Sequence, residues 1–402
     1  MRLVRTVKLG EVAEFVRGVT YKPTDVTTAD DPSGIPCLRT KNIQEKLEDE
    51  DLVFIPKAPI KDSKLVSEGD ILVSSANSWN LVGKCSWIPT LPYKATFGGF
   101  TSVLRSNQST VDRRYLYRWF SSPRIQELAR SFGQQTTNIS NLNQGRCLEL
   151  EIPLPPLDEQ KRIAATLDKA DQLRQKRRQA TAMLDSLTQS IFLEMFGDPV
   201  SNPRDWPLTA LGLLQAVGPN FGSMQPPSKD VREWISLRVA NIQNWEITLE
   251  DTKYIDLNDN EIERFTLKDG DIILARAIAS QEHLGKCVVV NVGSDKLAFD
   301  SHLMRIRLNQ QTILPEFLRE LFRTPGGRTI FLKSTRKTTV QYNINTKELN
   351  AIKIPLPPLV EQRQFVEQLR KLSAVRSRIN ENMRRDLALF SSLQHRAFSG
   401  QL

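Results

Sequence analysis

The chain has 402 residues, of which 40% are hydrophobic and 25% are charged. These proportions are typical of a water-soluble globular protein, and no apolar run is long enough to cross a bilayer, so the composition excludes a membrane-spanning protein. The formal net charge of +9 at pH 7 fits a polyanionic partner and equally fits a basic protein without one.

The amino-terminal residues and the cysteines indicate the compartment. Residues 1–8 lack the continuous apolar stretch of a signal peptide, so we expect a cytoplasmic protein. The cysteines have no paired short spacing, which argues against both disulfides and a zinc site. We therefore expect reduced thiols in the core at Cys37, Cys85, Cys147 and Cys287.

One segment of the sequence occurs twice. Residues 152–160 read IPLPPLDEQ, and residues 354–362, which lie 202 positions later, read IPLPPLVEQ. A period of this length indicates a duplicated domain with its connector, because solenoid repeats run to only about 20 to 50 residues. Further segments recur in the same order, namely 38–43 at 237–242, 69–72 at 270–273, and 83–85 at 285–287.

The sequence pattern of residues 1–152 predicts a first mixed α/β domain. Short apolar runs at 71–73 and 102–105 indicate strands, and the patterns at 113–120 and 123–132 indicate helices. Residues 201–354 predict a second domain of the same plan. Its strands are expected at 271–274 and 287–290, and a helix is expected at 315–322.

A long connector helix is expected after each domain, within residues 153–200 and 355–402. Proline is favoured in the first turn of a helix, and each connector begins with a proline pair. Apolar residues then recur at intervals of three and four over about 35 residues, as in a coiled-coil seam. The predicted seam consists of Ile163, Leu167, Leu173, Leu184 and Leu187 in the first helix, and Phe365, Leu369, Leu372, Val375 and Ile379 in the second.

We expect the two helices to pack as an antiparallel coiled coil. Arg177 and Asp386 fall on the seams, where they mark either the register or a contact with another protein. A helix of about 40 residues would span roughly 60 Å and would carry the domains to its opposite ends, related by a pseudo-two-fold axis. The predicted fold class is α+β, with two similar mixed α/β domains joined by two long helices.

The sequence offers little catalytic machinery. His283, His302 and His395 do not have the spacing of metal ligands. Residues 83–85 and 285–287 look like the end of a phosphate-binding loop, but the leading glycine is missing and cysteine replaces the hydroxyl residue that would hold magnesium. We expect turns between strands at both places, and a chain without catalytic, metal or cofactor residues.

Polar and basic residues in the predicted loops suit DNA binding. Arginine and lysine pair with guanine acceptors, asparagine and glutamine bridge adenine, and serine and threonine hold phosphates. Each alone is more often a solvated loop side chain, but their recurrence at matched positions favours a shared role. The candidates are Arg39, Lys41, Asn42, Ser75, Asn77, Lys84, Gln135, Thr136, Thr137 and Asn138, and in the second domain Arg238, Asn241, Arg276, Ser280, Lys286, Lys337, Thr338, Thr339 and Gln341.

Two variable domains that each end in the repeated proline-rich motif before a long helix resemble the specificity subunit of type I restriction-modification systems. The resemblance covers essentially the whole chain. Further motifs that support it are Leu-Gly-Glu-Val at 9–12, Gly-Asp-Ile at 69–71 and 270–272, and Phe-Gly-Asp at 196–198.

The resemblance implies a non-catalytic DNA reader. Each target-recognition domain would read one half of a bipartite, asymmetric DNA site, and the helices would set the spacer and dock two methyltransferase subunits. Restriction and translocase subunits would complete the complex. S-adenosylmethionine, ATP and magnesium are then expected on these partner subunits and not on this chain.

Two other readings stay open at this point. The modest charge and the lack of a long basic tail also fit a coiled-coil adaptor whose duplicated domains bind proteins and have no DNA role. A self-sufficient methyltransferase or nuclease is disfavoured by the missing motifs. DNA affinity that falls steeply with salt separates a reader from an adaptor.

Overall fold

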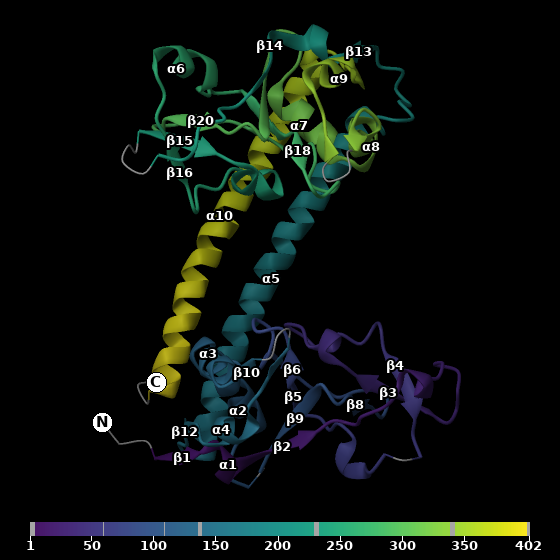
Figure 1. Cartoon of the computed structure of the whole chain (residues 1–402), viewed down its shortest axis with the longest axis vertical. Coiled ribbons are helices and arrows are strands. Elements are labelled where there is room, and N and C mark those ends of the chain that lie inside the picture. The colour runs from purple at the N-terminus through teal and green to yellow at the C-terminus, as the bar shows by residue number, and fades with distance from the viewer. Residues whose placement is uncertain are drawn as a thin grey trace. The chain divides into compact units, whose positions relative to one another are not determined.

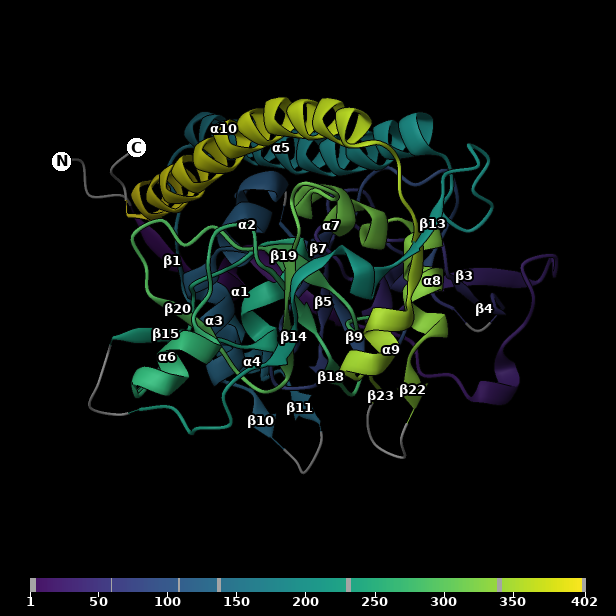
Figure 2. The ribbon, with the colours of Figure 1, turned by 90° about the horizontal axis from the view of Figure 1, so that it is seen from above.

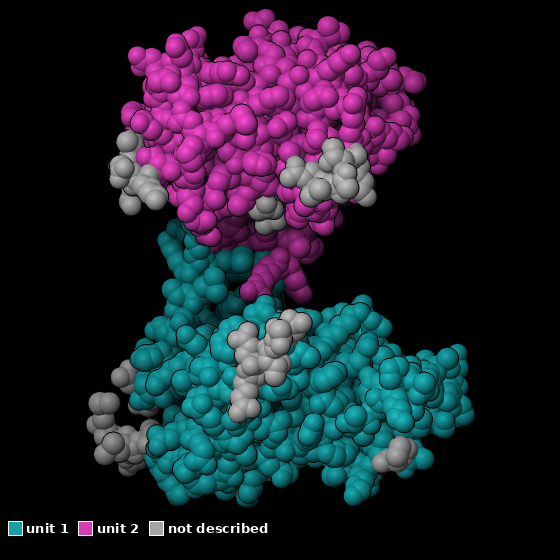
Figure 3. All heavy atoms as spheres, viewed as in Figure 1, with its two compact units in different colours: residues 1–177, 381–402 teal, residues 178–380 magenta. Residues whose placement is uncertain are grey.

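The computed structural model describes residues 5–58, 60–107, 109–135, 139–228, 233–337 and 342–399. The chain divides into two compact units, which Figure 3 colours separately. Unit 1 consists of residues 1–177 and 381–402, and unit 2 consists of residues 178–380. No helix among the described residues is both long and apolar enough to cross a membrane.

Unit 1 is built around a four-stranded antiparallel sheet, with three smaller sheets packed around it. The main sheet has the order β2 (Ala13–Arg17), β9 (Thr101–Ser106), β5 (Ile71–Ser74), β7 (Cys85–Trp87). The small sheets are β4 (Val53–Pro56), β3 (Gly34–Leu38), β8 (Thr96–Phe97); β10 (Gln134–Gln135), β11 (Ser140–Asn141), β6 (Ala76–Asn77); and β1 (Thr6–Lys8), β12 (Glu151–Pro153). Its short helices are α1 (Leu9–Val12), α2 (Arg113–Phe120), α3 (Pro123–Ser131) and α4 (Gln144–Leu148), with 3-10 turns η1 (Pro23–Asp25), η2 (Thr40–Asn42) and η3 (Asp62–Lys64).

Unit 2 repeats this topology. Its main sheet has the order β14 (Gln215–Phe221), β21 (Leu303–Leu308), β17 (Ile272–Ala275), β19 (Cys287–Val289). The small sheets are β16 (Lys253–Ile255), β15 (Trp234–Leu237), β20 (Leu297–Phe299); β18 (Ala277–Ile278), β23 (Tyr342–Asn343), β22 (Arg336–Lys337); and β13 (Leu208–Ala210), β24 (Lys353–Pro355). The short helices are α6 (Asp259–Phe265), α7 (Pro315–Arg323), α8 (Pro325–Lys333) and α9 (Thr346–Ala351), with 3-10 turns η4 (Leu211–Leu214) and η5 (Val239–Trp245).

The continuous apolar runs of β5 and β17 exist because both faces of each main sheet are buried. In β5, Ile71 and Val73 face the helical side, and Leu72 faces the small sheet. In β17, Ile272 and Ile273 divide in the same way between two core clusters. A strand that is covered on both faces reads as a continuous apolar run and not as an alternating pattern.

The Gly-Asp-Ile motif before β5 and β17 holds a buried ion pair in each unit. Asp70 accepts two hydrogen bonds from Arg105, at 2.9 and 2.7 Å, and Asp271 accepts two from Arg307, both at 2.7 Å. Each aspartate also accepts a backbone N–H three residues before it. The preceding glycine has φ +89° in the first copy and +80° in the second, a conformation that side chains disfavour. The motif therefore fixes the start of the central strand.

The repeated proline-rich motif ends in a buried glutamine that attaches each long helix to its unit. Gln160 accepts the N–H of Asp112 at 2.8 Å and donates to the Pro155 carbonyl at 2.8 Å. Gln362 accepts the N–H of Leu314 at 2.8 Å and donates to the Pro357 carbonyl at 2.9 Å. The same amide thus satisfies one buried loop N–H and one carbonyl at the start of the helix.

The two long helices, α5 (Leu157–Phe196) and α10 (Leu359–Phe398), run antiparallel within each unit. In unit 1, Arg177 forms an ion pair with Asp386, and the guanidinium of Arg174 lies 4.7 Å from the ring centre of Phe390. In unit 2, Arg376 donates to Asp185 at 3.1 Å, and the amide of Gln368 contacts the sulfur of Met195 at 3.8 Å. The predicted fold class is confirmed, and Arg177 and Asp386 mark the register by pairing with each other.

The predicted seam is not one uniform interface. Ile163 and Leu167 are buried in the core of unit 1, where α2 lies beside the first turns of α5 (Figure 1). Phe365 and Leu369 are likewise buried in the core of unit 2. The rest of the seam is only partly covered, because two helices alone cannot enclose a stripe. Leu184, Leu372 and Ile379 are half-buried, and Leu173, Leu187 and Val375 are 48%, 45% and 47% exposed.

The cysteines are free thiols, as predicted. Cys37, Cys147 and Cys287 are buried and Cys85 is half-buried. Burial raises the pKa of each thiol to about 12. Cys85 and Cys287 begin the matched strands β7 and β19, after turns in which Gly83 and Gly285 have positive φ.

The segment boundaries predicted at 152, 200 and 354 stay a prediction.

Replacing Gln362 with alanine should lower the free energy of unfolding by about 1 to 3 kcal/mol, because a buried backbone N–H loses its acceptor. Gln160→Ala should have an effect of the same size in unit 1. Urea denaturation followed by circular dichroism measures both. The matched control is Gln364→Ala, an exposed position on the same helix, which should stay within about 0.5 kcal/mol of the parent chain. Equal losses for Gln362→Ala and Gln364→Ala would contradict the anchoring role.

Replacing Asp271 with alanine should destabilise the chain by about 2 to 4 kcal/mol, because Arg307 is left half-buried without its counter-charge. The double variant with Arg307→Ala should recover part of this loss, and a double-mutant cycle measures the recovery. Glu233→Ala, which breaks the exposed Lys296–Glu233 pair, is the control and should change stability by less than about 1 kcal/mol. No recovery in the double variant would contradict the buried pair.

Candidate nucleic-acid interface

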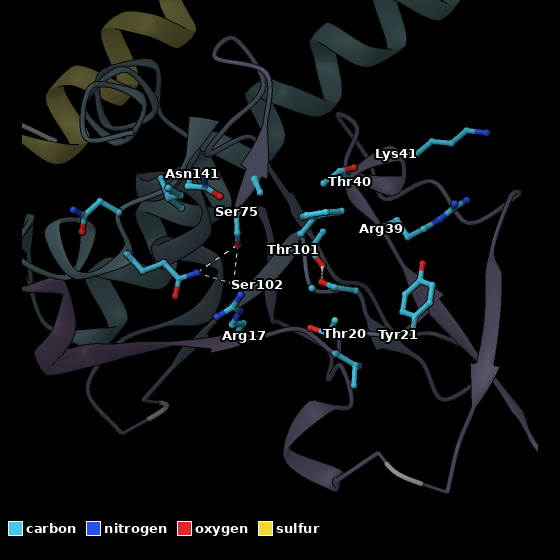
Figure 4. Close-up of a pocket in the computed structure, with 18 of the residues that line it drawn as sticks. Arg17, Thr20, Tyr21, Arg39, Thr40, Lys41, Ser75, Thr101, Ser102 and Asn141 are labelled. Atoms are coloured by element: carbon cyan, nitrogen blue, oxygen red, sulfur yellow. Dashed lines mark hydrogen bonds between the residues drawn. The ribbon is translucent and has the colours of Figure 1, made fainter. Parts of the chain in front are cut away.

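A hollow of about 1030 Å³ in unit 1 collects several of the predicted DNA-binding residues. Figure 4 shows Tyr21, Arg39 and Lys41 on one side of it, and Ser75 and Asn141 on the other. These side chains come from the end of β2, the turn after β3, the end of β5 and strand β11. The sheet order brings them together, because each of these strands ends at the same side of the unit.

The side of the hollow formed by Ser75 is a network of hydroxyl and amide groups. Ser75 donates to the hydroxyl of Ser102 at 2.7 Å, and the Gln144 amide donates to the same Ser102 oxygen at 2.7 Å and contacts Ser75 at 3.4 Å. Hydroxyls can both donate and accept, so this side can match base edges or phosphates without carrying a charge.

The matched arginines Arg39 and Arg238 each precede a 3-10 turn and make the same backbone hydrogen bond to an asparagine of it. The N–H of Arg39 donates to the side chain of Asn42 at 2.7 Å, and that of Arg238 donates to Asn241 at 3.0 Å. Asn42 and Asn241 are each 1% exposed and donate onward to backbone carbonyls. These two asparagines, predicted as DNA contacts, therefore hold the turns that present the arginines.

Aspartates hold the basic side chains of these turns in place. Lys41 forms an ion pair with Asp51, and Arg238 contacts Asp251 at 3.2 Å. Hydrogen bonding to Lys41 lowers the pKa of Asp51, and hydrogen bonding to Arg238 lowers that of Asp251. The Nε atoms of Arg39 and Arg238 are buried without a hydrogen-bond partner among the described residues. The donors left for a ligand are the terminal groups: Nη1 and Nη2 of Arg39, and Nη1 of Arg238, make no hydrogen bond to a described residue, whereas Nη2 of Arg238 bonds to Asp251.

Other predicted residues lie on neighbouring loops. Asn77 donates to the Ser74 hydroxyl at 3.2 Å, and Lys84 donates to the side-chain oxygen of Gln44 at 2.7 Å. Lys286, the counterpart of Lys84, is half-buried, as is Ser280, whose carbonyl accepts the N–H of His283. Lys84 does not line the hollow of unit 1, and Lys286 belongs to unit 2.

Two of the predicted residues lie in small antiparallel strand pairs. The backbones of Gln135 and Lys337 belong to strands β10 and β22, which pair with β11 and β23. In each unit this strand pair lies on the side away from the long helices (Figure 2). The other residues predicted in these two loops lie outside the described part of the chain, namely Thr136, Thr137, Asn138, Thr338, Thr339 and Gln341.

The sequence interpretation missed most residues of the hollow, among them Arg17, Tyr21 and Gln144. Arg17 and Tyr21 reach it from the end of β2, and Gln144 reaches it from the first turn of α4. A usable signal was Gly18, where a Cβ atom would lie 2.1 Å from the Gly98 carbonyl oxygen. Only glycine allows this approach, which brings the chain after β2 against the turn before β9.

Comparisons with known proteins agree over nearly the whole chain. A family model for the type I restriction modification DNA specificity domain matches residues 1–181 and 233–387. The specificity subunit of the type I restriction enzyme EcoKI of Escherichia coli K12 is 27% identical over 410 residues, which are 97% of this chain and 87% of that protein. The StySPI specificity subunit of Salmonella potsdam is 27% identical over 414 residues, 99% of this chain and 89% of the relative.

A solved structure has the same fold. The type I restriction-modification S subunit from M. genitalium covers 99% of this chain and 97% of its own, with a TM-score of 0.58 at 12% identity. The family match and the relatives do not support an adaptor without a DNA role. The chain belongs to the type I restriction-modification DNA specificity family, whose members are the non-catalytic sequence-recognition subunits of these systems.

Proposed function

We propose that each unit reads one half of a bipartite, asymmetric DNA site. The observation that carries this proposal is a common frame with different side chains on it. The turns that present Arg39 and Arg238 share one hydrogen bond, from the arginine N–H to the side chain of Asn42 or Asn241. A shared frame would place each unit on the duplex in the same way, and different neighbouring side chains would read different bases.

The side chains around the frame differ at matched strand positions. Ser75 follows β5, and Arg276 follows β17. Phe100 precedes β9, and His302 precedes β21. At these two positions unit 1 offers a hydroxyl and an apolar ring, and unit 2 offers a guanidinium and an imidazole. Two different donor sets favour two different half-sites, which makes the whole site asymmetric.

We assign the direct contacts to residues with accessible donors. Arg39 and Lys41 line the hollow of unit 1, and Arg238 occupies the matched turn in unit 2. Lys84 and Lys286 suit phosphates, since lysine acts as a point charge without the directional fork of arginine. The loop residues predicted from the sequence remain candidates. A chain that reads chromosomal DNA for such a system would act in the cytoplasm.

We infer further that the exposed middle of the long helices docks the partner subunits. Leu173, Leu187 and Val375 are about half exposed, and Met183 is 72% exposed. Exposed apolar surface that is contiguous marks a protein contact. The proposed partners are two methyltransferase subunits, with S-adenosylmethionine bound there, and restriction subunits that carry ATP and magnesium. The lengths of α5 and α10 would set the unread spacer.

Exchanging residues 1–152 for the matching domain of a relative tests the division of labour. The chimaera, expressed with its methyltransferase subunits, should methylate a site in which only one half has changed, because the second unit keeps its own contacts. Mapping of methylated adenines across the host genome gives the result. The reciprocal exchange of residues 201–354 is the control and should change only the other half. A change in both halves from either single exchange would rule out one domain for one half-site.

Replacing Arg39 with alanine should weaken binding to the cognate site by about 1 to 3 kcal/mol and relax one position of the first half-site. The loss follows from the unused donors of this arginine in the hollow. Fluorescence anisotropy of the assembled complex with duplexes that vary at each position measures it. Lys57→Ala removes the same charge from an exposed position outside the hollow and serves as the control. A loss that is the same for every sequence would instead assign Arg39 to a phosphate.

A further inference from the structure

Arg276 occupies a fixed position at the junction of two sheets in unit 2. It lies between β17 and β18, the latter labelled in Figure 1. Its N–H donates to the carbonyl of His302 at 3.0 Å, and its carbonyl accepts the N–H of Ile344 at 3.0 Å. Segments that are distant in the sequence thus hold its backbone on both sides.

The side chain of Arg276 is held as firmly as its backbone. The guanidinium carbon lies 4.2 Å from the ring centre of Phe221, and Nε donates to the Ser301 carbonyl at 2.7 Å. Stacking on an aromatic ring and one hydrogen bond fix the plane of the group. Nη1 and Nη2 have no hydrogen bond or ion pair to any residue that the structure describes. The two terminal amino groups are therefore oriented and still available.

The backbone that carries Phe221, the ring under the guanidinium, is also held in place. Gly222 follows Phe221, and a Cβ atom there would lie 2.2 Å from the Asp300 carbonyl oxygen. Only glycine lets the end of β14 approach this closely. The next N–H, that of Ser223, donates to the Phe299 carbonyl at 2.8 Å. The stacking ring and the Ser301 acceptor thus belong to one rigid contact.

The partial burial of the Arg276 charge is energetically unfavourable, and a binding role would explain why it is kept. Burial lowers the pKa of Arg276, since its charge is taken partly out of water. Asp300 is near, but it contacts His302, at 3.6 Å between Oδ2 and Nδ1, and makes no ion pair with Arg276 among the described residues. A partly desolvated cation with two unused donor groups is suited to a ligand with two adjacent acceptors.

Unit 1 has no stacked arginine at the matched position. Ser75 follows β5 as Arg276 follows β17, and its carbonyl accepts the N–H of Leu142 at 2.8 Å, as that of Arg276 accepts Ile344. The backbone frame is the same, but the hydroxyl of Ser75 bonds to Ser102. At the place of Phe221, β2 ends in Arg17. Only unit 2 presents a stacked guanidinium from this position.

We propose that Arg276 reads a guanine in the half-site of the second unit, through Nη1 and Nη2 to the O6 and N7 acceptors. This proposal rests on the function proposed above. Guanine alone offers two adjacent acceptors in the major groove, and an arginine fork matches them in two parallel bonds. A phosphate would also accept a fork, but it carries no sequence information and is served equally well by mobile lysines.

The test uses the complex of the full chain with its methyltransferase subunits and a set of duplexes that vary at each base pair of both half-sites. Arg276→Ala should reduce discrimination at a single G·C pair of the second half-site by roughly 5- to 150-fold. Arg276→Lys keeps the charge but loses the planar fork, and it should relax the same position. Neither variant should change the profile of the first half-site.

Arg264→Ala is the matched control, because that arginine also lies over an aromatic ring, 5.2 Å from Phe265, and its loss removes the same charge. It should relax no position. Uniform weakening by Arg276→Ala across all sequences, with a shallower salt dependence, would assign the residue to a phosphate and overturn the proposal. Full discrimination by Arg276→Lys would also overturn it, and this variant decides the question if the alanine variant fails to fold.

The outcomes also separate this proposal from the one on which it rests. If exchange of residues 1–152 changes one half-site and Arg276→Ala leaves the second unchanged, the assignment of Arg276 alone is wrong. If neither exchange divides the site into halves, the proposed function is wrong, whatever Arg276 does.

Discussion

The architecture depends on the burial of one amide at the start of each long helix. Gln160 and Gln362 each join a carbonyl of the proline-rich motif to the N–H of the residue before a short helix, α2 in unit 1 and α7 in unit 2. Proline supplies no N–H there, so the glutamine is the group that fastens the helix. If this attachment were flexible, the position of the helix would not fix the position of the unit that it begins from.

Much of the fold could be predicted because duplication exposes it. The repeated motif gave the two domains, and the apolar runs gave the central strands β5 and β17. The coverage of the helices could not be predicted, because heptad spacing does not distinguish a partner helix from a domain core. Leu167 and Leu173 look alike in the sequence, yet the first is buried in unit 1 and the second is half exposed.

The candidate site was harder to predict, because residue type alone does not distinguish a side chain that contacts a ligand from one that stabilises the fold. Arg39 and Asn42 are neighbours of similar polarity, but the arginine faces the hollow and the asparagine is enclosed beneath it. Arg17 and Gln144 reach the hollow only through the strand order, so no local pattern marks them. The two units keep the enclosed Asn42 and Asn241 alike, and they differ at the facing positions Ser75 and Arg276.

Unit 1 draws its last segment from residues 381–402, after the whole of unit 2 has been made. Phe390 and Ala397 belong to its core, and the ring of Phe398 lies 5.5 Å from that of Tyr115. At about 5 to 20 residues per second, a ribosome takes on the order of ten to forty seconds to cover the intervening chain. During that time the apolar surface that these residues cover is exposed on the nascent first unit and is open to chaperone binding.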